Sequence, residues 1–515
     1  MSKYVCGIDI GTTGVKVMIF DMDGTAISSN YSEYPCTFPQ TGWVEQDGNM
    51  TWQCTCETSK KAIEKSGLDP KEIVAIGLST QRCTVTPIDK DGNPLCDAIS
   101  WQDSRSFEEV EDIKRIVGEE KFYEITGYPL GTVLSVTEIM WWKKHKPEIY
   151  ENAYLFVLDQ ERVLHNLGVD GYYQDWSNGS LYGLMDIRKF EWDVELTKQL
   201  GIDPDKLPQL VPSGKVLGKV SKEAAELTGF AEGTLLVSGA GDQQCAGIGA
   251  GAIKDGVIEV TMGTAGVTLG YMGQANLDPS MKMPCAAHAI AGKWESEGLQ
   301  NAAGAAFKWY RNEFAFPEAQ KAAAEGLDVY DLIDEQIEQV EPGCNGLIFL
   351  PYLASSAAPN WDAFARGTFV GFNLGHGRAD MARAILEGVT FEAREIIDRM
   401  ISNGMAVNEI CLSGGGSKGA VWCQIQADIY GKPCTSLDVE EATTLGAAIL
   451  AALGAGLFDD VEQAVDKMLK RKKVYEPNME NHALYNKYFE LYKKSYQALS
   501  SAGIYEDLVK TALNK

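Results

Sequence analysis

Two short segments with the same pattern, one in each half of the chain, constrain the fold more than any other feature. They read "GIDIGTTGVK" at residues 7–16 and "EVTMGTAGV" at residues 259–267. Each predicts a strand, a turn of glycine, threonine and small residues, and a second strand. Glycine leaves backbone N–H groups open to approach, and threonine hydroxyls add donors, so such turns suit phosphate oxygens. The repeat therefore predicts two related domains that hold one polyphosphate between them.

The order of predicted elements indicates an α/β fold. With 515 residues the chain is too long for one core, so two large domains are expected. The first segment continues into an antiparallel meander that turns at Asp23-Gly24, then a helix from about 51 to 65 and a buried strand at 72–80. We expect mixed sheets flanked by helices, domains at 1–248 and 249–515 with a cleft between them, and a core helix within 445–458.

Composition excludes several classes of function. The net charge of −26 argues against a nucleic-acid surface, and an anionic ligand must be held by backbone N–H groups, a metal or a few cations. The twelve cysteines show neither a CxxC motif nor a metal-ligand spacing. No signal peptide or bilayer-spanning segment is visible. These features predict a soluble, cytoplasmic protein without a membrane partner.

Two isolated carboxylates are the candidate catalytic groups. Asp9 lies in an apolar strand just before the first turn, where Mg²⁺ would be a natural partner, although it could instead hydrogen-bond the turn. Asp242 follows the apolar strand "GTLLVSGAG" and is flanked by small residues. It could accept the proton of a hydroxyl during phosphoryl transfer, cap the following helix, or do both.

A third glycine-rich segment, "LSGGGSKGAVW" at 412–422, lies at a predicted strand-to-helix junction. Such junctions can accept a nucleotide base or ribose against bare backbone, and the alternative is a plain tight turn. No G-x-x-x-x-G-K-[ST] motif occurs in the chain, so a P-loop is not predicted.

Taken in order, these motifs resemble the FGGY family of carbohydrate kinases, within the actin-like ATPase superfamily. The resemblance covers essentially the whole chain and includes "SGAGDQQCAG", "GTFVGFNLGHGRADMARAILEGVTFE" and "EEATTLGAAILAALGAGLF". It implies two actin-like, ribonuclease H-like domains, with the sugar and the first phosphate loop on the N-terminal domain. The second phosphate loop and an adenosine loop fall on the C-terminal domain. It also implies ATP and Mg²⁺ as cofactors.

Carried onto this chain, the resemblance assigns roles to single residues. Asp242 becomes the general base, and Asp9, with Asp242, helps to hold Mg²⁺. The expected sugar-contacting residues are Gln81, Arg82, Cys83, Trp101, Asp103 and Gln243. The expected ATP-contacting residues are Gly11, Thr12, Thr13, Lys16, Gly263, Thr264, Gly304, Lys308, Gly414, Gly415 and Gly419.

Departures from the family pattern affect the substrate. Glycerol kinases have Gln-Arg-Glu where this chain has Gln81-Arg82-Cys83, and xylulokinases have Gln-Met-His. Glu138, in "SVTEIMWW", replaces the usual lysine of the first family signature. A xylulose-like ketose is the first expectation and glycerol or another short polyol is the second. The sequence leaves the oligomeric state open, a homodimer included.

Two other classes of function remain as alternatives. A sugar-binding sensor that had lost turnover would be expected to show a broken Asp9 or Asp242, and both are present. An actin-like chaperone or ATPase without a sugar substrate would lack the polar triplet and Trp101. A related activator class would need an iron–sulfur cysteine pattern, which the sequence does not show.

Overall fold

Two structural units share the chain, and neither is continuous in the sequence. The computed structural model describes residues 3–438 and 441–513. Of these, unit 1 contains the residues up to 253 together with 271–295 and 441–470. Unit 2 contains residues 254–270, the described part of 296–440, and the described residues from 471 onward. The sequence predicts a single change of domain after residue 248, whereas in the structure a later segment returns to unit 1.

Unit 1 is built on a six-stranded mixed sheet. Its strand order is β13 (Val216–Lys219), β14 (Leu235–Gly241), β5 (Ile73–Thr80), β1 (Tyr4–Ile10), β2 (Gly14–Asp21) and β3 (Ala26–Glu33). The meander β1–β2–β3 is antiparallel, as predicted, whereas β1, β5 and β14 run parallel to one another. The carboxyl ends of these three parallel strands therefore meet at one edge of the sheet.

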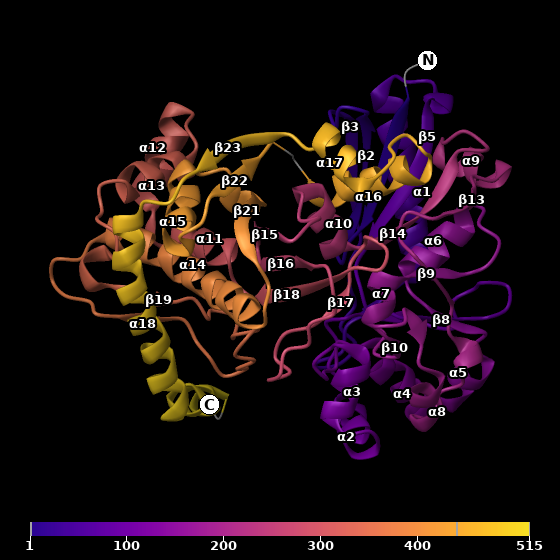
Figure 1. Cartoon of the computed structure of the whole chain (residues 1–515), viewed down its shortest axis with the longest axis horizontal. Coiled ribbons are helices and arrows are strands. Elements are labelled where there is room, and N and C mark those ends of the chain that lie inside the picture. The colour runs from indigo at the N-terminus through magenta and orange to yellow at the C-terminus, as the bar shows by residue number, and fades with distance from the viewer. Residues whose placement is uncertain (1–2, 439–440, 514–515) are drawn as a thin grey trace. The chain divides into compact units, whose positions relative to one another are not determined.

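Helix α16 (Ala442–Gly454) belongs to the segment 441–470, which returns to unit 1, and it packs on this sheet. Figure 1 shows the helix in yellow beside the indigo strands. The contact is close because the strands present glycine there. A Cβ atom on Gly7 would lie 2.0 Å from the carbonyl oxygen of Thr444, and one on Gly77 would lie 2.1 Å from that of Ala447. Thr444 and Ala447 are fully buried, so α16 is the core helix that its Gly- and Ala-rich sequence predicts.

Local sequence explains where the helices of unit 1 begin and end. The Asp47 side chain accepts a hydrogen bond from Asn49 N at 2.8 Å and caps the N-terminus of α1 (Gly48–Ser66). The C-cap residue of this helix, Gly67, adopts the left-handed conformation. The other helices of the unit are α2 (Phe107–Ile116), α3 (Glu119–Thr126), α4 (Ser135–His145), α5 (Pro147–Asn152), α6 (Asp159–Leu167), α7 (Trp176–Ser180), α8 (Val194–Gln199), α9 (Lys222–Thr228), α10 (Asp242–Ala250) and α17 (Val461–Met468).

Unit 2 repeats the strand arrangement on either side of the second turn. β15 (Gly256–Met262) and β16 (Gly266–Met272) are antiparallel, and β15 also pairs in parallel with β21 (Val407–Ser413). β1 pairs in the same way with β2 and β5, so the two glycine-threonine turns occupy equivalent positions in their sheets. The full sheet order is β17 (Ala286–Ala287), β18 (Trp294–Gln300), β16, β15, β21, β22 (Cys434–Leu437) and β23 (Arg471–Tyr475). The chain passes between the units within β16 and β18.

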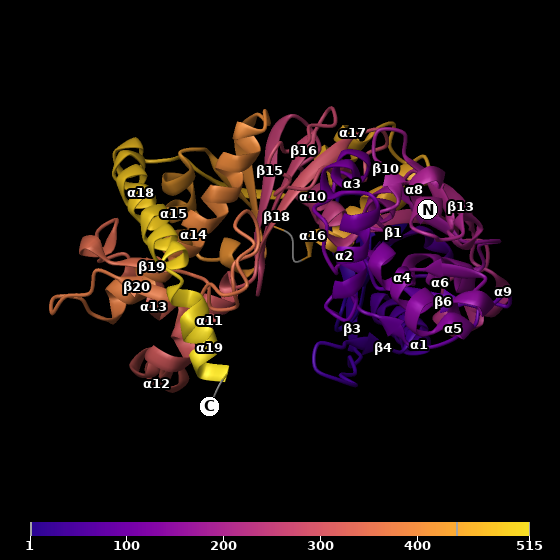
Figure 2. The same cartoon turned by 90° about the horizontal axis from the view of Figure 1, so that it is seen from below.

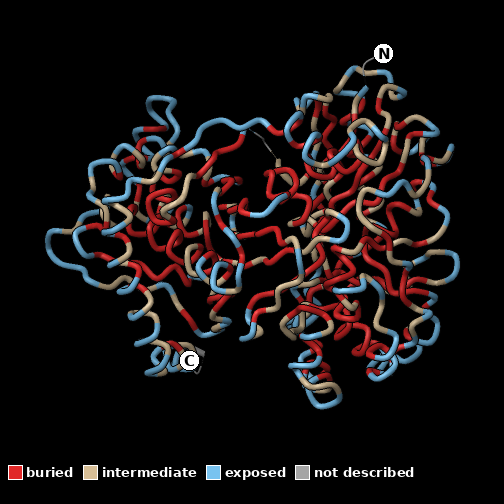
Figure 3. The backbone as a smooth tube through the Cα atoms, in the orientation of Figure 1, coloured by how far each residue is buried: buried red, intermediate tan, exposed pale blue. Residues whose placement is uncertain are grey.

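Helices cover the sheet of unit 2. The long amphipathic helix predicted over 381–401 is α14 (Arg378–Ser402), and α18 (Met479–Ser501) runs along α14 and α15 (Figure 2). The remaining helices are α11 (Gly304–Phe314), α12 (Phe316–Glu325), α13 (Val329–Ile337), α15 (Ala420–Tyr430) and α19 (Ile504–Leu513). In each unit the central strands are mostly buried, as the red tube in Figure 3 shows.

Five short strand pairs complete the structure: β4 (Glu45–Gln46) with β7 (Ala98–Ile99), β6 (Thr86–Ile88) with β8 (Leu155–Val157), β9 (Tyr173–Asp175) with β12 (Gln209–Val211), β10 (Met185–Asp186) with β11 (Glu191–Trp192), and β19 (Ile348–Leu350) with β20 (Thr368–Val370). Among the described residues, none of the helices is both long and apolar enough to cross a membrane. The twelve cysteines, all of them in described segments, are free thiols.

Candidate active site

The carboxyl edge of the unit 1 sheet brings together the charged residues that the sequence singles out. Asp9 is near the end of β1, Arg82 follows β5, and Asp242 directly follows β14. Asp9 is the register partner of Ser79, and Gly241 is that of Thr80. The parallel pairing thus places Asp9, Arg82 and Asp242 at neighbouring strand ends.

Asp9 is a carboxyl group held among like charges. Ser79 Oγ donates a hydrogen bond to Asp9 Oδ1 at 2.7 Å. The pKa of Asp9 is raised to about 7, mainly because the group is buried; the Ser79 hydrogen bond and the Lys16 charge lower this pKa, and the charges of Asp242 and Glu441 add to the rise. A buried carboxyl group with two further carboxylates acting on it forms an environment that favours a bound cation.

Asp242 and Arg82 form an ion pair. Arg82 Nε lies 3.2 Å from Asp242 Oδ1, and the side chains are 14% and 31% exposed, so the pair remains within reach of a ligand. Gln243 N also donates to Asp242 Oδ1, at 2.7 Å. Asp242 is the first residue of α10, and Gly241 occupies the N-cap position. The alternative in which Asp242 caps this helix is therefore corrected: its carboxylate lies in the first turn, where the helix dipole favours negative charge.

The first turn is fixed to the surrounding structure through its carbonyl groups. Tyr34 Oη donates to the carbonyl oxygen of Gly11, and Gln46 Nε2 donates to that of Thr12 at 2.7 Å. Trp101 Nε1 donates to Thr12 Oγ1 at 2.9 Å. Trp101 was predicted at the sugar and Thr12 at the phosphates, so this bond links the two predicted subsites within unit 1.

Lys16 and Thr13 occupy different surroundings on either side of this turn. The Lys16 ammonium pairs with the Glu441 carboxylate, which belongs to the segment that returns to unit 1. Lys16 is also the cross-strand partner of Asp9. Thr13 is exposed, and its hydroxyl lies 3.4 Å from Tyr31 Oη.

Gln81 and Cys83, on either side of Arg82, are buried, whereas Arg82 and Gln243 are half-buried. Gln81 Nε2 donates to Gln46 Oε1 at 2.7 Å and to Asp159 Oδ2 at 3.0 Å. Cys83 has no exposed surface, has a φ of 61°, and donates its thiol to the Leu181 carbonyl oxygen at 3.5 Å. Both side chains are therefore bonded within unit 1 rather than exposed to solvent.

Asp103 is committed to an ion pair. Arg105 Nη2 lies 2.7 Å from Asp103 Oδ2, both side chains are nearly inaccessible, and Val44 N donates to the same oxygen at 2.6 Å. Glu138 is buried close by. Burial raises the pKa of Glu138 well above its usual range, and the nearby Asp103 charge adds to this effect. Neither Glu138 oxygen has a hydrogen-bond partner among the described residues.

In unit 2, two predicted nucleotide glycines, Gly304 and Gly414, approach the second turn at Gly263. Gly304 N donates to the Gly263 carbonyl oxygen at 2.7 Å, and Ala303 N and Ala305 N both donate to the Thr264 carbonyl oxygen at 3.1 Å. A Cβ atom on Gly304 would lie 2.5 Å from the Gly263 oxygen, and one on Gly414 would lie 3.0 Å from the Met262 carbonyl group. Only glycine allows these loops to approach so closely.

The other nucleotide candidates extend from this junction. Lys308 is exposed on α11, one helical turn after Gly304. Gly415 is exposed, and Gly419 precedes α15, where its Cβ position would lie 2.9 Å from Asp334 Oδ2. Burial raises the pKa of Asp334 to about 6.

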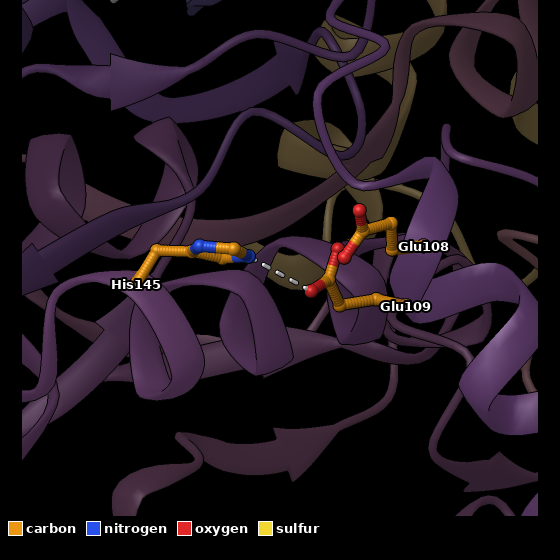
Figure 4. Close-up of side chains that lie close together, drawn as sticks. All are labelled: Glu108, Glu109 and His145. Atoms are coloured by element: carbon orange, nitrogen blue, oxygen red, sulfur yellow. Dashed lines mark hydrogen bonds and ion pairs between the residues drawn. The ribbon is translucent and has the colours of Figure 1, made fainter.

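Another cluster of titratable side chains lies between α2 and α4, away from the strand ends. Figure 4 shows Glu108, Glu109 and His145, whose ligand atoms lie within 4.8 Å of one another. Lys144 Nζ lies 3.0 Å from Glu108 Oε2 and 3.5 Å from Glu109 Oε1. Because this ammonium already pairs with both carboxylates, we assign no metal site to the cluster.

Sequence reasoning missed Glu441 and Ser79, which contribute to the surroundings of Asp9. Glu441 lies 425 residues from its partner Lys16, and nothing in the local pattern joins them. Ser79 could have been found, since a polar residue ends an otherwise apolar strand next to Gln81 and Arg82.

The paired α/β units, with a glycine-threonine turn on each sheet and a carboxylate beside an arginine at the strand ends, define a class of two-domain phosphotransferases. The chain belongs to the FGGY family of carbohydrate kinases: residues 4–249 match the N-terminal domain of that family and residues 258–455 match its C-terminal domain. It is an ATP-dependent phosphotransferase, and the predicted family and fold class are confirmed.

Relatives of known activity differ in substrate. The chain is 31% identical to a xylulose kinase of Staphylococcus epidermidis over 96% of this chain and 97% of the relative. It is 31% identical to a gluconokinase of Bacillus subtilis, with 90% of each chain covered. It is 32% identical to a glycerol kinase of Thermococcus onnurineus over 96% of this chain and 98% of the relative. The crystal structure of a ligand-bound xylulose kinase from Lactobacillus acidophilus superposes with a TM-score of 0.88 at 28% identity, covering 97% of this chain and 98% of the other.

Proposed function

We propose that this kinase transfers the γ-phosphate of ATP to a hydroxyl group of a neutral small sugar, a xylulose-like ketose first and a short polyol such as glycerol second. The observation that carries the proposal is the Arg82–Asp242 pair at the carboxyl edge of the sheet. Asp9 lies on β1, two strands away from β14, the strand that Asp242 follows. Arg82 presents a rigid set of donors suited to adjacent oxygens of a sugar.

Asp242 is the general base of the proposed reaction. Its carboxylate accepts the proton of the sugar hydroxyl as that oxygen forms its bond to the γ-phosphorus. The bond between the γ-phosphorus and the bridging oxygen breaks, and its electron pair leaves with ADP. Arg82, whose Nε lies 3.2 Å from Asp242 Oδ1, keeps the carboxylate oriented.

Mg²⁺ and ATP fit the remaining groups. Asp9, and with it Asp242, would hold Mg²⁺, because their mutual repulsion is relieved by a divalent cation. Bound Mg²⁺ would neutralise phosphate charge during the transfer. Gly11, Thr12, Thr13 and Lys16 are the proposed phosphate contacts of unit 1. Those of unit 2 are Gly263, Thr264, Gly304, Lys308, Gly414, Gly415 and Gly419.

Charge balance favours a neutral acceptor over an aldonate such as gluconate. The charges of Asp242 and Glu441 both act on Asp9 at the strand ends, where Arg82 and Lys16 supply the opposing charge. Both of these cations already pair with a carboxylate. A substrate carboxylate would meet net negative charge there, within a chain of net charge −26.

A coupled ADP-release assay with Mg-ATP and D-xylulose, glycerol or gluconate tests the proposal. We expect the highest kcat/KM with xylulose and the lowest with gluconate. In Asp242→Asn, kcat should fall roughly 10²- to 10⁴-fold, the usual range for loss of a general base. The exposed Asp170→Asn is the matched control. Efficient turnover of gluconate would refute the charge argument, and normal kcat in Asp242→Asn would remove Asp242 from the mechanism.

The same assay separates the kinase from a sensor. If none of the acceptors increases ADP release although they bind in calorimetry, a sugar-binding sensor replaces the kinase in this proposal. A cytoplasmic location and a homodimer are further parts of the proposal. Fractionation of the source cells and light scattering of the purified chain would measure them.

A further inference from the structure

Asp175 accepts more hydrogen bonds than its position requires. It ends β9 and caps the short helix α7, for which the bonds from Ser177 N at 2.8 Å and Asn178 N at 3.2 Å would suffice. The side-chain amides of Gln160, Gln174 and Asn178 also donate to Oδ2, at 2.9, 3.2 and 2.8 Å. Asp175 has no exposed surface, so the structure maintains a fully buried carboxylate with donors on both oxygens.

Two of these donors connect Asp175 to the strand ends that carry the candidate active site. Ser177 donates its hydroxyl proton to Asp175 Oδ1, and Ser177 Oγ accepts a hydrogen bond from Gly241 N at 3.0 Å. Asn178 Nδ2 donates to Thr80 Oγ1 at 3.2 Å as well as to Asp175. Gly241 and Thr80 are register partners on β14 and β5.

The residues fixed in this way immediately precede the reacting groups. Gly241 is followed by Asp242, and Thr80 is followed by Gln81 and Arg82. A serine hydroxyl has one proton, and because Asp175 accepts it, the Ser177 oxygen is left to face the Gly241 N–H group. The carboxylate of Asp175 therefore determines the direction of the hydrogen bond that holds the residue before the base.

We propose that Asp175 is a positioning residue for phosphoryl transfer, acting through Ser177 and Asn178 to hold the ends of β14 and β5 in register. This inference rests on the proposed function, in which Asp242 is the base. Displacing a reacting group by about 1 Å can reduce turnover roughly 10²-fold. A loss of this register would slow the phosphoryl-transfer step, in which Asp242 is the base, and would leave the nucleotide contacts of unit 2 in place.

The test compares two serines that bond the same carboxylate. Ser177→Ala removes the link to Gly241, whereas Ser213→Ala removes only a 3.4 Å bond to Asp175 Oδ1. We expect kcat to fall about 10- to 100-fold in Ser177→Ala. The KM for ATP, the sugar-independent ATP hydrolysis and the melting temperature should change little. In Ser213→Ala, kcat, the KM for ATP and the ATP hydrolysis rate should stay within two-fold of the wild-type values. The melting temperature should stay within a few degrees of that of the wild type. Asp175→Asn places an amide N–H group where the surrounding groups are all hydrogen-bond donors. If this variant folds, its kcat should fall at least as much as that of Ser177→Ala.

The results separate this inference from the proposed function. If Asp242→Asn is inactive but Ser177→Ala and Ser213→Ala have the same kcat, the positioning role is overturned and the base remains. If Ser177→Ala loses ATP hydrolysis and thermal stability in proportion to kcat, its role is structural and the inference is also overturned. If Asp242→Asn keeps normal turnover, the proposed base and the positioning role fall together.

Discussion

Replacing Gly446 with alanine should disturb catalysis from a helix that carries none of the proposed reacting groups. Gly446 lies in α16 and faces α10, the helix that begins with Asp242. A Cβ atom at this position would lie 1.8 Å from the Cys245 carbonyl oxygen and 2.6 Å from the carbonyl carbon. Because both atoms belong to backbone, no side-chain rotation can make room for the methyl group.

The expected magnitude follows from this geometry. Nonbonded heavy atoms pack at roughly 3.5 Å, so α10 and α16 must separate locally by about 1.7 Å. Overpacking of this kind costs roughly 1–3 kcal/mol of folding free energy. If α10 takes up even about 1 Å of the shift, Asp242 moves with it, and kcat should fall about 10²-fold, equivalent to about 2.7 kcal/mol in activation free energy.

The assay is steady-state ADP release with saturating ATP and acceptor, accompanied by thermal unfolding. Gly131→Ala is the matched control, because the nearest atom to its Cβ position is 4.0 Å away and its φ lies outside the left-handed region. The KM for ATP should change less than kcat in Gly446→Ala. A Gly446→Ala variant with wild-type kcat would refute the claim that the α10–α16 contact fixes the base.

Three further changes have defined outcomes. Arg82→Ala should raise the KM for the sugar at least 10-fold and leave sugar-independent ATP hydrolysis nearly intact; a loss of ATP binding instead would place Arg82 outside the sugar site. Trp101→Phe removes the 2.9 Å bond to Thr12 and should raise the KM for ATP several-fold, which an unchanged KM would contradict. His288 is buried and neutral, because burial lowers its pKa from an ordinary 6.5 to about 4. Its stabilising contribution is therefore present above pH 6.5 and lost between pH 6.5 and 4, about 3 kcal/mol in all, so denaturant unfolding of the wild type should weaken more over this range than that of His288→Gln.

Much of the fold follows from local patterns in the sequence. The glycine-threonine turns, the meander at Asp23-Gly24 and the long amphipathic helix α14 were all predicted, because strand and helix periodicities report which face is buried. The proximity of Asp9, Arg82 and Asp242 follows from parallel pairing, which gathers strand ends at one edge. Asp9 and Asp242 could be selected from the sequence as isolated carboxylates beside apolar strands, and Arg82 through the family resemblance, but the pairing that brings them together was not predicted.

Partners distant in the sequence could not be predicted. The Gln81 side chain, for example, donates a hydrogen bond to Asp159, which lies 78 residues later in the chain. Glu441 reaches Lys16 only because α16 packs against β1, a contact that depends on the surface of the whole sheet. Periodicity identifies a buried helix but does not say which unit buries it.

The return of residues 441–470 to unit 1 has a consequence for synthesis on the ribosome. The rest of unit 1, apart from residues 271–295, has been translated by residue 253, yet α16 follows only after roughly 190 more residues. At about 5–20 residues per second, the nascent sheet waits roughly 10–40 s for the helix that covers Gly7 and Gly77. During this interval its apolar face is open to chaperones, or to the same face of another nascent chain. A chain truncated before residue 441 would keep that face exposed permanently.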